Sequence, residues 1–106
     1  MKEAIEITTF KLNGCTYEQF IAANAGIDAW LLLQPGFRSR RMARRGDGVI
    51  VDMLVWGSAA EGTGAMQRLM DELHDSPVHA MIDQASASWT IAPVRHHIQS
   101  APLISL

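Results

Sequence analysis

The sequence has few of the residues that cross-link a chain or anchor it in a membrane. Its single cysteine, Cys15, has no partner for an internal disulfide, which is typical of a reducing compartment. No apolar run approaches the ~18 residues that a membrane-spanning helix needs. Glu3 and Glu6 interrupt any apolar core of a signal peptide. We therefore expect a cytoplasmic protein without a membrane partner.

Positive charge is also scarce. Nine Lys and Arg residues stand against eleven Asp and Glu residues, which gives a formal net charge of −2. A nucleic-acid-binding surface combines an excess of basic residues with interleaved aromatic side chains. The chain has neither feature, so we expect no nucleic-acid partner.

Apolar residues are the abundant class. The 106 residues suffice for one domain, and 48% of them are hydrophobic, including six Met and three Trp. A domain of this size buries only about two thirds of the surface of its unfolded chain. So much apolar area indicates a second surface to pack against, and a partner subunit would provide one.

Turn and cap signals divide the first part of the chain. The β-branched stretch 4–12 predicts a strand, which ends at the turn signal of residues 13–14. Thr16 then starts a capping box, and apolar residues at helical spacing predict one helix over residues 17–33. Pro35 ends this helix, because the residue before a proline disfavours helical geometry.

Similar signals order the rest. We expect a strand over 37–45, a Gly-Asp-Gly hairpin loop, a strand over 49–56, a helix from Ser58 to Leu73, a short helix that Ser76 and Pro77 start, and a strand over 88–98. The order βαββαβ is the split βαβ, or ferredoxin-like, motif of α+β proteins. Right-handed crossovers predict an antiparallel sheet with strand order 4-1-3-2 and both helices on one face. Pro93 fits this order, because the fourth strand lies at an edge.

The first and third strands carry apolar residues on both faces. The face without helices would then meet a second copy, and two sheets packed face to face make a homodimeric α/β barrel. We expect one such domain over residues 1–98 and a C-terminal tail over 99–106. The leucines and Ile104 of this tail are expected to dock on the partner subunit.

Three segments carry a family resemblance: "QPGFRSR", "GDGVIVDMLVW" and "MIDQASASWTI". On these segments, and over about residues 4–98, the chain resembles the dimeric α+β barrel superfamily, in particular antibiotic biosynthesis monooxygenase-like domains. The superfamily includes cofactor-free monooxygenases of polyketide quinol precursors, haem-degrading enzymes and isomerases. The resemblance therefore implies the fold and leaves the activity open.

Five of the seven arginines lie between Arg38 and Arg45. Asp52 and Glu6 are carboxylates on predicted central strands, and a buried carboxylate is costly without a partner. A neighbouring arginine can supply one through a bidentate pair. We favour ion pairing over anion binding, and anion binding over nucleic acid, as the reason for this cluster.

Candidate catalytic residues follow partly from the resemblance. Trp56 matches the tryptophan that ends the third strand in the monooxygenase-like families, where it lines the pocket; a core tryptophan is the structural alternative. Asp52, four residues earlier, stands where these families often place an asparagine. It is a candidate base, or it pairs with an arginine. His79 is a candidate base from the short helix, or a half-exposed surface residue.

Trp30 and Trp89 are candidates for stacking on a substrate, and Arg40 for stabilising an anion. The histidines lack metal-ligand spacing, because His74 and His79 flank a helix break and His96 and His97 point to opposite faces of a strand. We therefore expect no metal site. The haem degraders' asparagine on the first strand is missing, and Asp83 stands near the place of their histidine, so haem degradation is not expected either.

Together with these residues, the family resemblance implies a cofactor-independent monooxygenase that acts on a small aromatic or quinol-like molecule. The alternative is a non-catalytic homodimer that binds a small molecule or a partner, since both need an apolar pocket with a few polar groups.

Overall fold

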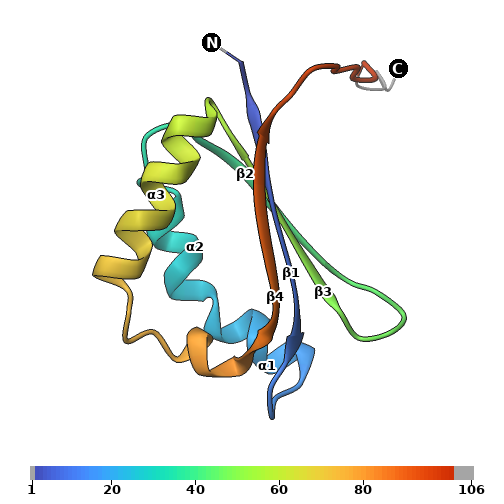
Figure 1. The fold of residues 1–106 in the computed structure, drawn as a ribbon, viewed down its shortest axis with the longest axis vertical. Coiled ribbons are helices and arrows are strands. Elements are labelled where there is room, and N and C mark those ends of the chain that lie inside the picture. The colour runs from blue at the N-terminus through green and yellow to red at the C-terminus, as the bar shows by residue number, and fades with distance from the viewer. Residues whose placement is uncertain (1, 102–106) are drawn as a thin grey trace, which may run out of the picture.

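The computed structural model describes residues 2–101 and contains a four-stranded antiparallel sheet with helices on one face. The elements are, in order, β1 (Ala4–Leu12), α1 (Tyr17–Ala23), α2 (Ala25–Leu31), β2 (Phe37–Arg44), β3 (Ile50–Trp56), α3 (Ala59–Glu72), the 3-10 helix η1 (Pro77–Met81) and β4 (Ile82–Pro93). The strand order β2-β3-β1-β4 is the predicted one. The ferredoxin-like α+β fold is therefore confirmed (Figure 1).

The N-cap predictions hold at all three places where they were made. Thr16 forms the capping box of α1 with Gln19, the Ser58 side chain accepts the backbone N–H of Glu61, and Ser76 caps η1 ahead of Pro77. Such caps satisfy backbone N–H groups that have no partner within the helix. Within residues 2–101, no helix is long and apolar enough to cross a membrane.

The single helix expected over 17–33 is wrong, because the chain forms two helices that meet at Asn24. The Asn24 side chain is buried and donates to the carbonyl oxygen of Phe20 at 2.9 Å. An asparagine side chain that bonds to a nearby carbonyl competes with the helical backbone pattern. The second helix ends at Leu31, so Leu32 and Leu33 are exposed.

The limits of the fourth strand also differ from the prediction. β4 begins at Ile82, six residues early, because Ile82 and Asp83 pair with the end of β1 beyond an irregularity between Thr9 and Lys11. It ends at Pro93, which has no N–H to donate, and not at Ile98. β4 is an edge strand, as Pro93 predicted. Residues 102–106, which include the leucines and Ile104 of the predicted tail contact, lie outside the described residues.

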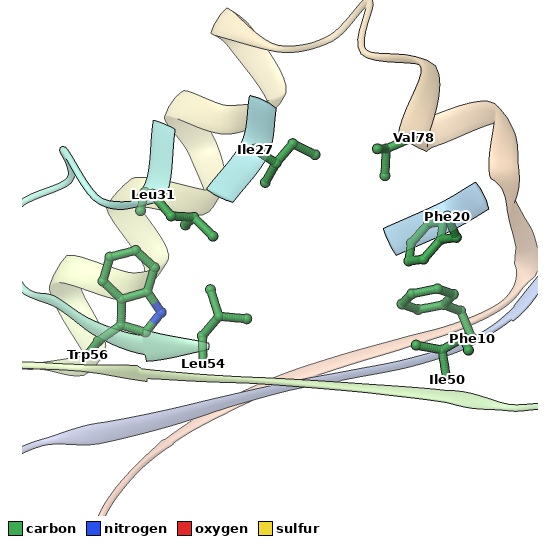
Figure 2. Close-up of a cluster of buried hydrophobic side chains, with 9 residues drawn as sticks. Phe10, Phe20, Ile27, Leu31, Ile50, Leu54, Trp56 and Val78 are labelled. Atoms are coloured by element: carbon green, nitrogen blue, oxygen red, sulfur yellow. The ribbon is translucent and has the colours of Figure 1, made fainter. Parts of the chain in front are cut away.

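The apolar core fills the space between the sheet and the helices (Figure 2). At one end, Trp56 lies near Leu31 and packs edge-on against Phe37, with ring centroids 5.5 Å apart. At the other end, Phe10 and Phe20 form a second edge-on pair at 5.4 Å. The two groups hold the helices to the sheet at both ends of the layer.

The opposite face of the sheet carries a separate apolar patch. Side chains alternate along a strand, so Ile5 and Ile7 of β1 point away from the helices, next to their register partners Val55 and Met53 of β3. Val51 extends this row, and all five side chains are half-buried in the single chain. The prediction that β1 and β3 are apolar on both faces is confirmed. We call Ile5, Ile7, Val51, Met53 and Val55 the outer patch.

Gly62 lets the first half of α3 approach the sheet closely. A methyl group at Gly62 would overlap with Ile91 Cδ1 and stand 2.8 Å from Trp56 Cδ1. One at Gly64, two residues on, would meet only the flexible end of Arg68, at 3.3 Å.

Gly62→Ala should therefore lower the free energy of unfolding by about 1–3 kcal/mol through overpacking, although alanine favours the helix by about 1 kcal/mol. The matched control Gly64→Ala should be neutral or stabilising. Urea denaturation of both variants tests this pair; equal effects would contradict the close approach at Gly62.

Candidate functional site

A cavity of about 450 Å³ lies between the sheet and the helices. Its walls are mainly apolar and come from β1, α1, α2, β3, α3 and η1. Of the polar side chains of the sheet that line it, four form what we call the polar floor: Glu6, Arg40, Asp52 and Trp89. Each points toward the helices because it occupies an inward position of its strand.

Arg40 is the centre of the polar floor. Its Nε and Nη2 donate to the two carboxylate oxygens of Asp52 at 3.0 and 2.8 Å, a bidentate pair across β2 and β3. Nη1 donates to Asp28 of α2 at 2.8 Å, and Nη2 also donates to Asn24 Oδ1 at 2.9 Å. Arg40 thus ties two strands to the junction of α1 and α2.

The charge of Arg40 is stable in this setting. Burial alone would lower the pKa of Arg40, but the hydrogen bond and charge of Asp52, and then those of Asp28, outweigh burial and raise it. Arg40 is therefore a permanent cation whose donors are almost all engaged by the protein itself.

Ion pairing is confirmed as the role of several arginines in the cluster. Besides the Arg40 pairs, Arg38 contacts Glu3 at 3.0 Å and Arg45 contacts Asp47 at 2.7 Å. These two pairs are exposed, whereas the Arg40–Asp52 pair is largely buried.

Glu6 is the buried acid that sequence reasoning did not place in the site. It is 5% exposed, and its carboxylate accepts Nε1 of Trp56 at 2.8 Å and Nε1 of Trp89 at 2.7 Å, one on each oxygen. Burial raises the pKa of Glu6 above its ordinary value, against the lowering effect of the two indole donors. The signal was present in the alternation around it: an acid between Ile5 and Ile7 on a central strand faces the helices.

The structure brings four of the six predicted site residues to the cavity. Asp52, Arg40 and Trp89 belong to the polar floor, and His79 lines the cavity from η1. The Nε2 atom of His79 lies 2.8 Å from the carbonyl oxygen of Leu73. Since a carbonyl only accepts, Nε2 carries the hydrogen and Nδ1 is the acceptor in the neutral ring.

The other two predicted site residues lie outside the cavity lining. Trp56 is 1% exposed and belongs to the core, which was the alternative to a pocket role. It is connected to the site through its hydrogen bond to Glu6. Trp30 packs half-buried against the core from α2. Within residues 2–101, no three His, Cys, Asp or Glu side chains are grouped so that they could hold a metal ion.

Comparison with known proteins supports the fold. No family model and no curated protein sequence matches the chain. Among solved structures, the cofactor-independent oxygenase SnoaB from Streptomyces nogalater is similar with a TM-score of 0.75 and 19% identity over 94% of this chain and 100% of SnoaB. The ActVA-Orf6 monooxygenase of Streptomyces coelicolor, in complex with nanaomycin D, has a TM-score of 0.64 and 19% identity, and 94% of each chain is covered.

A third similar structure, a putative antibiotic biosynthesis monooxygenase from Nitrosomonas europaea, has a TM-score of 0.68 and 11% identity over 88% of this chain and 90% of that one. The structural neighbours are thus antibiotic biosynthesis monooxygenase-like domain proteins. The chain has the fold of this group, as its sequence resemblance predicted.

Removing the cation of the polar floor should destabilise the protein strongly. Arg40→Met leaves Asp52 buried without its partner, so we expect a loss of about 3–5 kcal/mol in the free energy of unfolding. Arg45→Met breaks only an exposed pair and should cost less than about 1 kcal/mol. Guanidinium unfolding checks both variants, and a small effect of Arg40→Met would argue against a role of this cluster in stability.

Proposed function

We propose that this chain is a cofactor-independent monooxygenase that acts on a small aromatic or quinol-like substrate in the cavity. The observation that carries the proposal is an apolar cavity of about 450 Å³ with a compact polar floor on the sheet. Small-molecule sites combine this size with mostly apolar walls and a few polar groups. The oxygenases with the same fold add support.

The reaction needs an electron-rich substrate anion and molecular oxygen. For an anthrone-like ring, a base removes one proton, the carbanion reacts with O2, and the resulting peroxide loses water. One oxygen atom enters the product as a carbonyl, and the other leaves as water. The protein's part is to bind the ring, remove and return a proton, and exclude solvent.

The side chains at the cavity can be given roles in this scheme. We assign Trp89, which lines the cavity, to stacking on the ring, and His79, whose Nδ1 is the free acceptor of the neutral ring, to proton exchange. Both oxygens of Asp52 accept hydrogen bonds from Arg40, which favours a positioning role for this pair. Trp56 would act indirectly by holding Glu6, and Trp30 by supporting α2.

Turnover of 1,8-dihydroxyanthrone tests the proposal. The purified protein should accelerate quinone formation over the uncatalysed rate with no added cofactor, with one O2 consumed per quinone, as an oxygen electrode and mass spectrometry with ¹⁸O2 would measure. Leu69→Trp fills the cavity from α3 and should reduce the rate at least tenfold, whereas Gln67→Trp on the exposed side of α3 should not. Tight binding of this compound and related quinols without turnover would instead support the non-catalytic binding protein.

We also propose that the outer patch packs against a second copy, which would make the predicted homodimer. The patch is a contiguous apolar area in the middle of the sheet, on the side where Figure 1 shows no helix. Apolar faces of this kind mark interaction surfaces in soluble proteins.

Light scattering at micromolar concentration should therefore give twice the 11.7 kDa mass of one chain. Met53→Lys places a charge in the outer patch and should yield monomers, while Gln67→Lys adds the same charge on α3 and should leave the dimer intact. A monomeric wild-type protein with a normal circular dichroism spectrum would refute the dimer.

A further inference from the structure

Glu6 is the one acid of the polar floor without a cationic partner among the described residues. Its two hydrogen-bond donors are the neutral indoles of Trp56 and Trp89, at 2.8 and 2.7 Å. Asp52, by contrast, has both oxygens engaged by Arg40. A carboxylate oxygen can accept two hydrogen bonds, so Glu6 keeps acceptor capacity while it lines the cavity.

The charges around the floor also limit what the cavity can bind. The single positive charge of Arg40 faces the negative charges of Asp52 and Asp28, so this cluster has no surplus positive charge for a ligand. An ionised Glu6 adds a further negative charge. A ligand that arrives as an anion would meet like charges in a setting of low dielectric constant, which is costly.

We propose that Glu6 is the catalytic base of this cavity and that the site selects neutral hydroxyaromatic substrates over carboxylated ones. This inference rests on the proposed monooxygenase function. Glu6 accepts the proton from the acidic C–H or O–H bond of the neutral ring, which becomes the anion while Glu6 becomes neutral. The net charge of the cavity stays constant, so the substrate anion forms without the cost of burying a second negative charge.

The proton is then returned within the same cycle. After O2 has added to the ring anion, Glu6 gives its proton to the terminal peroxide oxygen. This oxygen leaves as water with the second hydrogen of the substrate carbon, and the carboxylate is restored. Trp89 is a positioning residue in this scheme, because its indole N–H holds one oxygen of Glu6 and stabilises the ionised form.

Several charged or titratable groups face Glu6 from the elements around it. They are Arg40 of β2, Asp52 of β3, Asp28 of α2 beyond Arg40, His74 after α3 and His79 of η1. Burial and Asp52 raise the pKa of Glu6, while Trp89, Trp56 and Arg40 lower it. The balance lies above the ordinary value, so Glu6 becomes an effective base only as the pH rises through its raised pKa.

Anaerobic binding of 1,8-dihydroxyanthrone tests Glu6 apart from oxygenation. Under nitrogen, wild-type protein should convert the bound neutral compound into its coloured anion, which absorption spectroscopy detects. Glu6→Gln should bind the compound, as tryptophan quenching would show, with at least tenfold less anion at the same pH. The matched control Glu72→Gln, an exposed residue at the end of α3, should behave as wild type.

Trp89→Phe provides a second measurement if Glu6→Gln does not fold. Loss of the indole donor raises the pKa of Glu6 further, so the midpoint of anion formation should move to higher pH. The control His96→Gln, at an exposed residue beyond β4, should leave the acidic midpoint unchanged. Anion formation by folded Glu6→Gln at the wild-type level, or an unmoved midpoint in Trp89→Phe, would overturn the assignment. Anion formation without oxygenation in air would refute the proposed function but retain Glu6 as a base.

Charge selection is tested with two aromatic ligands that differ by one carboxyl group. We expect 1,8-dihydroxyanthraquinone to bind at least tenfold more tightly at pH 8 than its 2-carboxylated analogue. Arg40→Met is not suitable here, because it disrupts the floor itself. Equal binding of both ligands by wild-type protein would contradict the predicted preference for neutral substrates.

Discussion

The pairing of Arg40 with Asp52 is the interaction on which the rest of the site depends. Both side chains are largely withdrawn from water, with 13% and 11% of their side-chain surface exposed. A buried ion pair gives little net stability over apolar packing, but loss of one partner leaves an uncompensated charge. Its position is therefore strongly constrained, and the contacts of Arg40 with Asn24 and Asp28 transmit that constraint from the sheet to the helices.

The two acids of the polar floor differ in their hydrogen-bond partners. Both oxygens of Asp52 are bound by Arg40, and Arg40 in turn connects the sheet to the helices. Glu6 sits on the next strand, within the same layer, but receives only neutral donors. Two carboxylates a strand apart thus have different environments, which is how proteins separate a structural acid from one that can exchange a proton.

Much of the fold could be predicted from local signals. Thr16, Ser58 and Ser76 predicted the helix starts, and the element order with right-handed crossovers predicted the sheet order. The apolar residues of β1 and β3 predicted the two apolar faces. The break at Asn24 could not be predicted, because the Asn24 side chain is held by the carbonyl of Phe20 and also by Arg40, a residue distant in sequence. β4 starts early because Ile82 and Asp83 pair with Leu12 and Lys11 beyond a register shift. The polar residues at the start of β4 gave no signal of this pairing.

The part of the site that depends on charge pairing could be predicted. The part that depends on contacts between distant segments was missed. A carboxylate near a row of arginines predicts a bidentate pair, as Asp52 and Arg40 form. That Trp56 and Trp89 both turn their indole nitrogens to Glu6 depends on the register of three strands.

The close approach at Gly62 has a consequence for how this protein could diversify. α3 rests on the sheet at Gly62 and Ala65, while its later residues Met66, Leu69 and Met70 form the roof of the cavity. The first half of α3 is thus fixed against the sheet, while its second half lines the cavity. Substitutions in its second half can therefore widen or narrow the ligand space while the proton-handling chemistry below stays the same, so substrate range and reactivity can evolve separately.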